Sequence, residues 1–349
     1  MISVSDMSKC SIYIIFLIIM VSKISSCFAE SDIKSQIPKH ILNQKRTNYL
    51  TLSVENDLFG SGRDSNYTSG ILLTYLDAGN DASLKWLQPL LPFYTFNETT
   101  SSVYYFGQSM FTPDDITIPT PQYENRPWAA FLYGSAGATT LVGNHINDLN
   151  ITLGMIGPWA QGERAQKFVH SIIGSPTPLG WSNQLNNEPG LILSYRRRWP
   201  VQLVENHHNL SLSIDYNLGT SIGNVYTLAD TGFTFRVSPA SERWQDSPML
   251  VPPSMPGTGY FYSQSGQLGW YLFAGLQGRV VARNIFLDGN TYSNSYSISK
   301  KPLVMDAVGG ISINYSDFRL AYTAIYRTKE FDMQMENTFF GSISVSYRC

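Results

Sequence analysis

The chain has 349 residues, of which 43% are hydrophobic, 13% aromatic and only 14% charged. Charged residues usually make up about a quarter of a soluble globular chain, so this scarcity favours a chain that exposes much of its surface to lipid. The formal net charge is -2. This balance excludes a basic surface large enough to bind nucleic acid through counterion release, and we expect no nucleic-acid partner.

The N-terminal residues have the pattern of an export signal. Lys9 precedes an apolar run of roughly ten residues, 12–21, which ends in small and polar residues. A membrane-spanning helix needs roughly 20 apolar residues. The pattern therefore predicts a signal peptide over 1–29, cleaved after Ala29, and a barrel domain over 30–349. The alternative is a lipoprotein signal, in which Cys27 would carry the lipid.

After the signal, the chain alternates apolar and polar residues with a period of two. The clearest segment is 210–218, where every even position is apolar and every odd position is polar. Similar patterns occur at 149–155, 311–315 and 341–347. No later segment approaches about 18 uninterrupted apolar residues, which excludes a helical membrane protein. The alternation predicts strands with one face toward lipid or a core and the other toward a polar interior.

The predicted strands lie near 46–56, 68–77, 102–111, 127–142, 148–156, 189–199, 209–219, 224–237, 266–277, 279–287, 303–316, 318–328 and 338–349. These thirteen segments predict about twelve strands, give or take about two, and an even number of short antiparallel strands is typical of outer-membrane barrels. We therefore predict an all-β fold, a twelve-stranded antiparallel transmembrane β-barrel in the bacterial outer membrane. Trp128, Trp199 and Tyr226 are predicted to form its interfacial girdle, the alternative being ordinary core aromatics.

Three stretches without alternation, 111–127, 157–188 and 238–265, are predicted to be long extracellular loops. The second contains a predicted short helix over 162–174, with Gly174 as its C-terminal stop. Its apolar residues recur at helical spacing and form one face: Ala165, Phe168, Val169, Ile172 and Ile173. Because loops of this length usually carry function, the helix is a candidate part of a functional site.

His170 on this helix is the candidate general base. It lies four residues after Gln166 and seven after Glu163, so the three side chains share a stripe beside the apolar face. Imidazole changes its protonation state close to neutral pH, which suits the activation of water for ester hydrolysis. The alternative is a surface histidine in the last helical turn.

Two clusters of residues with side-chain oxygens are predicted at one rim of the barrel. Asn56 and Asp57 follow the first predicted strand and the segment 64–70 opens the second, so a hairpin would bring the two clusters together. Carboxylate, amide and hydroxyl oxygens are the ligands that calcium prefers, and the ion could polarise a substrate carbonyl. The alternative is that Asn and Asp occupy these positions because they favour turns.

A resemblance to the outer-membrane lipid A 3'-O-deacylase family rests on segments that match in order and spacing across nearly the whole mature chain: 53–57, 66–70, 126–129, 157–158, 166–174 and 180–184. The resemblance implies a twelve-stranded barrel that uses calcium to remove ester-linked acyl chains from lipid A, the lipid part of lipopolysaccharide. It implies His170 as the base that activates water. It also implies Asn56, Asp57 and Thr68 as the site at the barrel wall, with Asp57 holding a cation that acts as an oxyanion clamp.

The chain departs from the family pattern at three positions. Pro176 stands where some members carry a carboxylate, six residues after the helix histidine. No clear counterpart to a basic residue of some members is found near Ile118, so recognition of a lipid A phosphate is expected to differ. The chain also ends in Cys349, whereas outer-membrane barrels tend to end in an aromatic residue.

Two other functions stay open on the sequence. A phospholipase of the outer membrane would release fatty acid from purified phospholipid vesicles in the presence of calcium. A non-catalytic barrel, such as a porin or an adhesion protein, would leave lipid A unchanged.

Overall fold

The computed structural model describes residues 48–59, 66–78, 88–89, 91–239, 245–246, 255–262 and 266–349. The predicted signal peptide, 1–29, lies outside these ranges and stays a prediction. Within them, no helix has both the length and the apolar character needed to cross a membrane.

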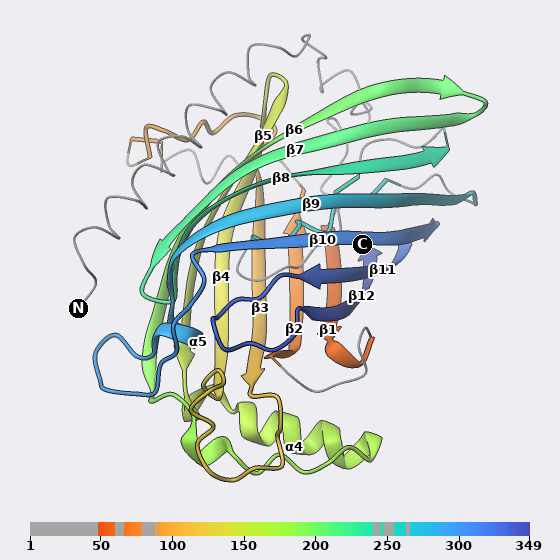
Figure 1. Ribbon diagram of the computed structural model, residues 1–349. Coiled ribbons are helices and arrows are strands. Elements are labelled where there is room, and N and C mark those ends of the chain that lie inside the picture. Colours follow the sequence, from red (N-terminus) through yellow and green to blue (C-terminus); the bar gives the residue numbers. More distant parts are fainter. Residues whose placement is uncertain are drawn as a thin grey trace.

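Antiparallel strands form a closed barrel in which each strand pairs with the next along the chain and β12 pairs with β1 (Figure 1). The strands are β1 (Asn48–Asn56), β2 (Asn66–Asp77), β3 (Ser101–Thr112), β4 (Ala129–Val142), β5 (His145–Ile156), β6 (Glu188–His207), β7 (Leu210–Gly223), β8 (Tyr226–Pro239), β9 (Leu268–Asn284), β10 (Leu303–Tyr315), β11 (Phe318–Arg327) and β12 (Thr338–Arg348). The predicted twelve-stranded antiparallel transmembrane β-barrel is confirmed. The segments predicted near 266–277 and 279–287 are not two strands, because β9 is continuous and is followed by the short helix α5 (Ile285–Asp288).

The period-two pattern sorts side chains between the two faces of the wall. In β1, Leu50 and Leu52 are 41% and 45% exposed, whereas their neighbours Thr51 and Ser53 are buried. The same alternation gives most strands exposed Leu, Ile, Val, Phe or Tyr on the outside of the barrel. Such a surface is stable only in contact with lipid, because water would leave a large contiguous apolar area hydrated.

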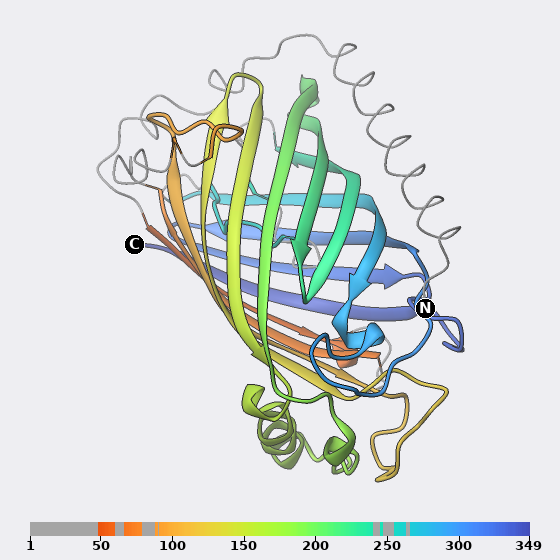
Figure 2. The same ribbon diagram turned by 90° about the vertical axis from the view of Figure 1, so that its left-hand side faces the viewer.

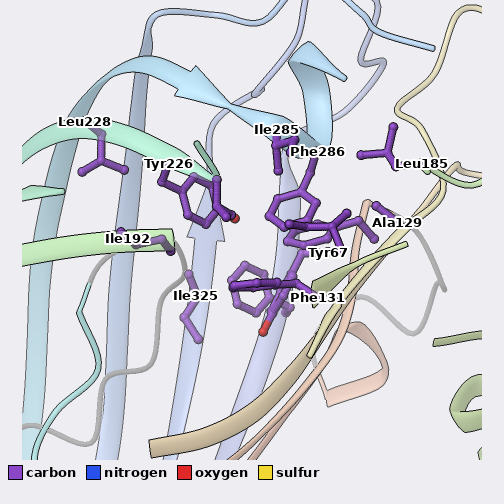
Figure 3. Close-up of a cluster of buried hydrophobic side chains, with 14 of the residues drawn as sticks. Tyr67, Ala129, Phe131, Leu185, Ile192, Tyr226, Leu228, Ile285, Phe286 and Ile325 are labelled. Atoms are coloured by element: carbon purple, nitrogen blue, oxygen red, sulfur yellow. The ribbon is translucent and has the colours of Figure 1, made fainter. Parts of the chain in front are cut away.

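The barrel interior is packed with side chains. Tyr67, Phe131, Tyr226 and Ile325 meet in one buried cluster, although they come from β2, β4, β8 and β11, which lie on different sides of the barrel (Figure 3). Tyr226 was predicted to lie in the membrane girdle, and this prediction is wrong. A tyrosine at a strand end satisfies either role, and only the direction of its side chain decides between them.

Buried ion pairs extend this packing. Asp306 accepts hydrogen bonds from Arg279 at 2.5 Å and from Arg327 Nε at 2.9 Å. Near the same end of the barrel, Arg126 Nη1 lies 3.4 Å from Glu330 Oε2. Each of these three contacts pairs a buried cation with a buried anion, as buried charges require.

The two ends of the barrel differ. We call the end at which β1, β3 and β5 finish the helix rim, and the end that holds Asn48 and Cys349 the terminal rim. Because the strands alternate in direction, the connection from β8 to β9 lies at the terminal rim, opposite the other two long connections. The prediction of 238–265 as an extracellular loop beside 111–127 and 157–188 is therefore wrong. The length of this segment suggested an extracellular loop. However, every connection that follows an even-numbered strand lies at the terminal rim, because consecutive strands run in opposite directions.

The described part of this connection reaches into the barrel. Asp246 accepts a hydrogen bond from Arg198 Nη1 at 2.5 Å through its carboxylate, and one from Arg319 Nη1 at 3.1 Å through its carbonyl oxygen. Burial by itself raises the pKa of the Asp246 carboxyl, but Arg198 and the hydrogen bonds from Thr258 outweigh it and hold this pKa below its ordinary value. Arg196 also donates to the carbonyl oxygen of Met255 at 2.6 Å. Residues 245–246 and 255–262 of the connection thus pack against the interior wall.

Candidate functional site

The predicted loop helix is present as α4 (Gly162–Ile173), which lies outside the barrel at the helix rim and runs across the direction of β1 to β4 (Figures 1 and 2). It follows the short helix η3 (Pro158–Ala160) and precedes η4 (Trp181–Asn183). α4 packs on β3 and β4, and η3 packs on β4 and β5. The helix therefore covers a patch of the outer wall close to the rim.

The face that α4 turns toward the wall is not its apolar face. Its buried residues are Gly162, Gln166 and His170, each four positions apart. Phe168 and Ile172, from the predicted apolar face, are 66% and 67% exposed. The helix is as predicted, and Gln166 and His170 share a stripe. Glu163, which was predicted to share that stripe, instead pairs with Lys167 on the exposed surface of the helix. An apolar helix face usually marks the packed side in water-soluble proteins, but here that face is exposed.

Gly162 sets how closely α4 approaches the wall. A Cβ atom at this position would lie 2.4 Å from Cβ of Ala130 and 2.7 Å from Cη2 of Trp181. Such distances are far below van der Waals contact, so a larger residue would push the helix outward. A buried cluster lies under this contact and joins strand and loop residues: Met110, Ile116, Trp128, Ala130, Ala160 and Trp181.

Replacing Gly162 with valine is therefore expected to displace α4 while leaving the barrel folded, because the strands do not depend on this contact. We expect most of the lipid A deacylation that the family resemblance implies to be lost, with the heat-modifiable migration of the barrel unchanged. The matched control is Gly134→Val in β4, because only the carbonyl oxygen of Tyr105 lies within 4 Å of a Cβ there, at 4.0 Å, and the position is not in contact with α4. Equal activity of wild type and Gly162→Val would contradict the role of this contact.

Gln166 and the two tryptophans form the core of the docked helix. Trp181 Nε1 donates to Gln166 Oε1 at 2.8 Å, and the Trp181 ring lies 5.1 Å from that of Trp128. Gln166 Nε2 is buried and has no hydrogen-bond partner within the described ranges. Trp128 was predicted to lie in the girdle, but it is 2% exposed because Gly180 and Trp181 cover it. Trp199, the remaining girdle residue, is half-buried.

His170 is held in one tautomer by a backbone acceptor. Its Nδ1 lies 2.6 Å from the carbonyl oxygen of Pro176, which can only accept, so Nδ1 carries the hydrogen and Nε2 the lone pair. The loop makes this contact because α4 ends at Gly174, whose φ is 72° and whose N–H donates to the His170 carbonyl at 2.9 Å. Pro176, where the chain departs from the family pattern, thus presents its backbone carbonyl oxygen to the imidazole.

Asn56, Asp57 and Thr68 come together at the helix rim, as the predicted hairpin requires. Asn56 is opposite Ser69 in the pairing of β1 with β2, which places it beside Thr68. Asp57 begins the short helix η1 (Asp57–Phe59) and is 1% exposed. The β2–β3 register shifts between Tyr67 and Ser69, so Thr68 lies in a β-bulge. Such bulges commonly redirect a side chain at a rim.

Thr68 lies on the outer face of the wall, which is also the face that α4 covers. Its Oγ1 is 2.6 Å from Oγ1 of Thr112, two residues after Met110 in β3. Met110 belongs to the cluster beneath α4, and Gln108 donates to the carbonyl oxygen of Ala160 at 2.6 Å. Positions 108, 110 and 112 share one face because side chains alternate along a strand. β3 therefore connects the Thr68 rim to the docked helix.

The structure thus brings the predicted residues to one rim: β2 and α4, which carry Thr68 and His170, both adjoin β3, whereas Asn56 and Asp57 lie one strand further on, beside β2. Their catalytic roles stay a prediction. Sequence reasoning missed Thr112, the Pro176 carbonyl and Trp181 as parts of this region. Only Trp181 had a signal, because it lies in the segment 180–184. Thr112 lies beside Thr68 only because of the β2–β3 register, which the sequence does not specify. The Pro176 contact is made by a backbone carbonyl, which every residue has, so no residue type could indicate it.

The donor chemistry suits a hard cation. Asp57 offers a buried carboxylate, and Asn56 and Thr68 offer neutral oxygens, which are the ligand types calcium takes. No group of three or more His, Cys, Asp or Glu residues within the described ranges forms a metal-binding cluster. A cation at this rim would accordingly rely on one carboxylate and on amide, hydroxyl or substrate oxygens.

A barrel with an apolar outer surface defines an outer-membrane β-barrel protein. In this one, α4 and the candidate site residues lie at the outer wall and rim of the barrel, not in its interior. A family model described as "Outer membrane protein LpxR" matches residues 14–349. The chain belongs to this family, which is the lipid A 3'-O-deacylase family that its motifs resemble, and its location is the bacterial outer membrane.

A solved structure at low sequence identity has the same fold. LpxR from Salmonella typhimurium is similar with a TM-score of 0.69 and 19% identity, covering 86% of this chain and 99% of that chain. The β-domain of the Bordetella autotransporter BrkA has a TM-score of 0.40 and 7% identity, covering 86% of this chain and 98% of that one. No curated protein sequence matches the chain.

Proposed function

We propose that the protein is a calcium-dependent hydrolase that removes one or more ester-linked acyl chains from lipid A in the outer membrane. Family membership supports this substrate class. The observation that carries the proposal is the placement of His170, buried between α4 and the wall with its Nδ1 on the Pro176 carbonyl. A histidine in this tautomer, on a helix docked at the rim that also carries Asn56, Asp57 and Thr68, supports hydrolysis by an activated water.

In the proposed reaction, His170 Nε2 takes a proton from a water molecule as that water attacks the carbonyl carbon of the ester. The C–O bond to the sugar then breaks, and the protonated imidazole returns the proton to the leaving sugar oxygen. The products are a free fatty acid and a sugar hydroxyl, so no covalent acyl-enzyme is needed. The Pro176 carbonyl stabilises the ring orientation during both transfers.

Asp57, together with oxygens of Asn56 and Thr68, would hold the calcium ion. When bound, the ion supplies positive charge that polarises the ester carbonyl and stabilises the developing oxyanion. Asp57 contributes the only formal charge of this trio. The hydrogen bond between Thr68 and Thr112 fixes the hydroxyl position on the outer wall.

Mass spectrometry of lipid A from cells with and without the expressed protein tests the proposal. Loss of mass corresponding to one or more acyl chains is the expected result. A phospholipase is the alternative with the same chemistry, and it would instead release fatty acid from purified phospholipid vesicles with calcium. Unchanged lipid A together with hydrolysed phospholipid would favour that alternative.

A porin function is disfavoured by the filled interior. Arg126 stacks 4.6 Å above the Phe111 ring near the helix rim, and Asp246 is bound by Arg198 and Arg319 nearer the terminal rim. We therefore expect the purified protein to show no steady single-channel conductance in planar bilayers, measured beside a known porin as the positive control. Stable open channels in the wild-type protein would contradict a closed interior.

A further inference from the structure

The surface of α4 divides into three sectors. Each residue of a helix turns by about 100°, so residues four apart stay on one side. Gly162, Gln166 and His170 form the buried sector against the wall. Two exposed sectors flank it, one polar and one apolar. The polar sector comprises Glu163, Lys167 and Ser171, and the apolar sector comprises Phe168, Val169 and Ile172.

The apolar sector is large for a surface helix. Phe168, Val169 and Ile172 are 66%, 44% and 67% exposed, and Trp159 in the preceding turn is 65% exposed. On the polar side, Lys167 Nζ binds Glu163 Oε1 at 2.6 Å. Contiguous exposed apolar groups of this size, rimmed by charge, mark a surface that contacts something other than water.

The apolar sector is continuous with the lipid-facing belt of the barrel. On β3, the outward residue Phe106 is 59% exposed, and the next outward residue, Gln108, already bonds to Ala160 at the start of the α4 region. On β5, Leu153 is 59% exposed, and the strand ends three residues later beside η3. The helix thus begins where the exposed belt of these strands stops.

We propose that α4 lies in the plane of the outer leaflet, with Phe168, Val169 and Ile172 inserted among the acyl chains and Glu163, Lys167 and Ser171 in the aqueous headgroup layer. The occupant of the apolar sector is membrane lipid. The buried sector is fixed against the barrel wall, so the apolar and polar sectors point in opposite directions along the membrane normal. Only in this orientation does the apolar sector contact acyl chains while the polar sector contacts water. Three long connections, 113–128, 157–187 and 285–302, lie at the helix rim, whereas the terminal rim has two, 78–100 and 240–267, and the short turns 143–144, 208–209 and 316–317. Long loops are typical of the extracellular side and short turns of the periplasmic side, so the helix rim is assigned to the outside.

This placement has a functional consequence that rests on the proposed deacylase activity. The buried sector of α4, which carries His170, would lie at the boundary between headgroups and acyl chains. Ester bonds of membrane lipids lie at this boundary. A substrate could then reach the site sideways, within the leaflet, without leaving the membrane.

Neighbouring positions of α4 give a matched test. In a background with Cys10, Cys27 and Cys349 replaced by serine, Ile172→Cys and Ser171→Cys are each labelled with a polarity-sensitive fluorophore. The full-length barrel is reconstituted into phosphatidylcholine vesicles with or without lipids that carry a nitroxide quencher on their chains. The label at position 172 should emit at shorter wavelength and lose most of its fluorescence to the quencher, whereas the label at 171 should do neither.

Equal behaviour of the two labels would overturn the proposal. A blue-shifted label at 172 that the lipid quencher does not reach, and whose emission depends on protein density in the vesicle, would also overturn it and indicate contact with a second copy of the chain. Because the readout needs no turnover, it is repeated with His170→Ala. Quenching at 172 without any deacylation by the wild type would leave the membrane contact intact and reject the proposed function alone.

The functional consequence is tested with Phe168→Asp combined with Ile172→Asp. We expect this variant to lose most activity on lipid A embedded in vesicles and to regain it on lipid A dispersed in detergent micelles, where no leaflet has to be entered. The control, Lys167→Ala with Ser171→Ala, changes the polar sector and should retain activity in both. Equal losses in vesicles and micelles for the aspartate variant would reject lateral entry.

Discussion

Replacing His170 with alanine is expected to abolish the removal of acyl chains from lipid A while the barrel still folds. Loss of a general base usually lowers a rate by about 10²- to 10⁴-fold. The fold should survive because the strands are closed by backbone pairing all round the barrel, and α4 lies outside it. Lipid A mass spectrometry measures the activity, and heat-modifiable migration on a gel reports the folded barrel.

His207→Ala is the matched control, because His207 is an exposed histidine at the terminal rim, at the end of β6. It should retain wild-type activity. His170→Gln offers a further comparison, since an amide can still donate to the Pro176 carbonyl but cannot take a proton from water. Activity near the wild-type level in His170→Gln would show that the histidine positions the loop and is not the base.

Replacing Asp57 with asparagine is expected to be nearly as damaging. The change keeps the size of a buried side chain and removes the negative charge that would hold calcium. If the cation stabilises the oxyanion, its loss should lower activity by about 10²-fold or more. Initial rates of fatty-acid release are measured over a series of calcium concentrations, and part of the lost activity should return at high calcium.

Asp115→Asn is the control for charge alone, because Asp115 lies in an exposed loop after β3 and binds Thr117 through a side-chain hydrogen bond of 2.6 Å. It should leave the calcium dependence unchanged. Wild-type protein that has been treated with a chelator and keeps full activity would reject the metal. An Asp57→Asn variant with unaltered rates and calcium response would instead show that the ion binds elsewhere.

The barrel could be predicted from the sequence because lipid and a polar interior impose opposite demands on successive residues. The segment 210–218 shows this in full, and β7 forms there. The hairpin that brings Asn56 beside Thr68 was predicted for the same reason, since consecutive strands pair. The strand count near β9 was less certain because two alternating segments run together without a turn between them.

The rest of the site depends on contacts that periodicity does not encode. The sequence pattern of an apolar helix face is the same whether that face packs on a protein core or contacts lipid. The exposure of Phe168 and Ile172 could therefore not be deduced from the pattern. Trp128 and Tyr226 could not be assigned to an interface or an interior from their types alone. The side of the β8–β9 connection was mistaken because length was given more weight than strand parity.

By itself, the sequence determined that this protein is an outer-membrane barrel with a loop helix that carries His170, because alternation and helical spacing are local properties of the chain. Only the tertiary structure decided which side of that helix meets the wall. That choice depends on Gly162 fitting against Ala130 and Trp181, on the Gln166–Trp181 hydrogen bond and on the Pro176 carbonyl. These contacts join residues from separate segments, and their energy depends on distances that no local pattern specifies.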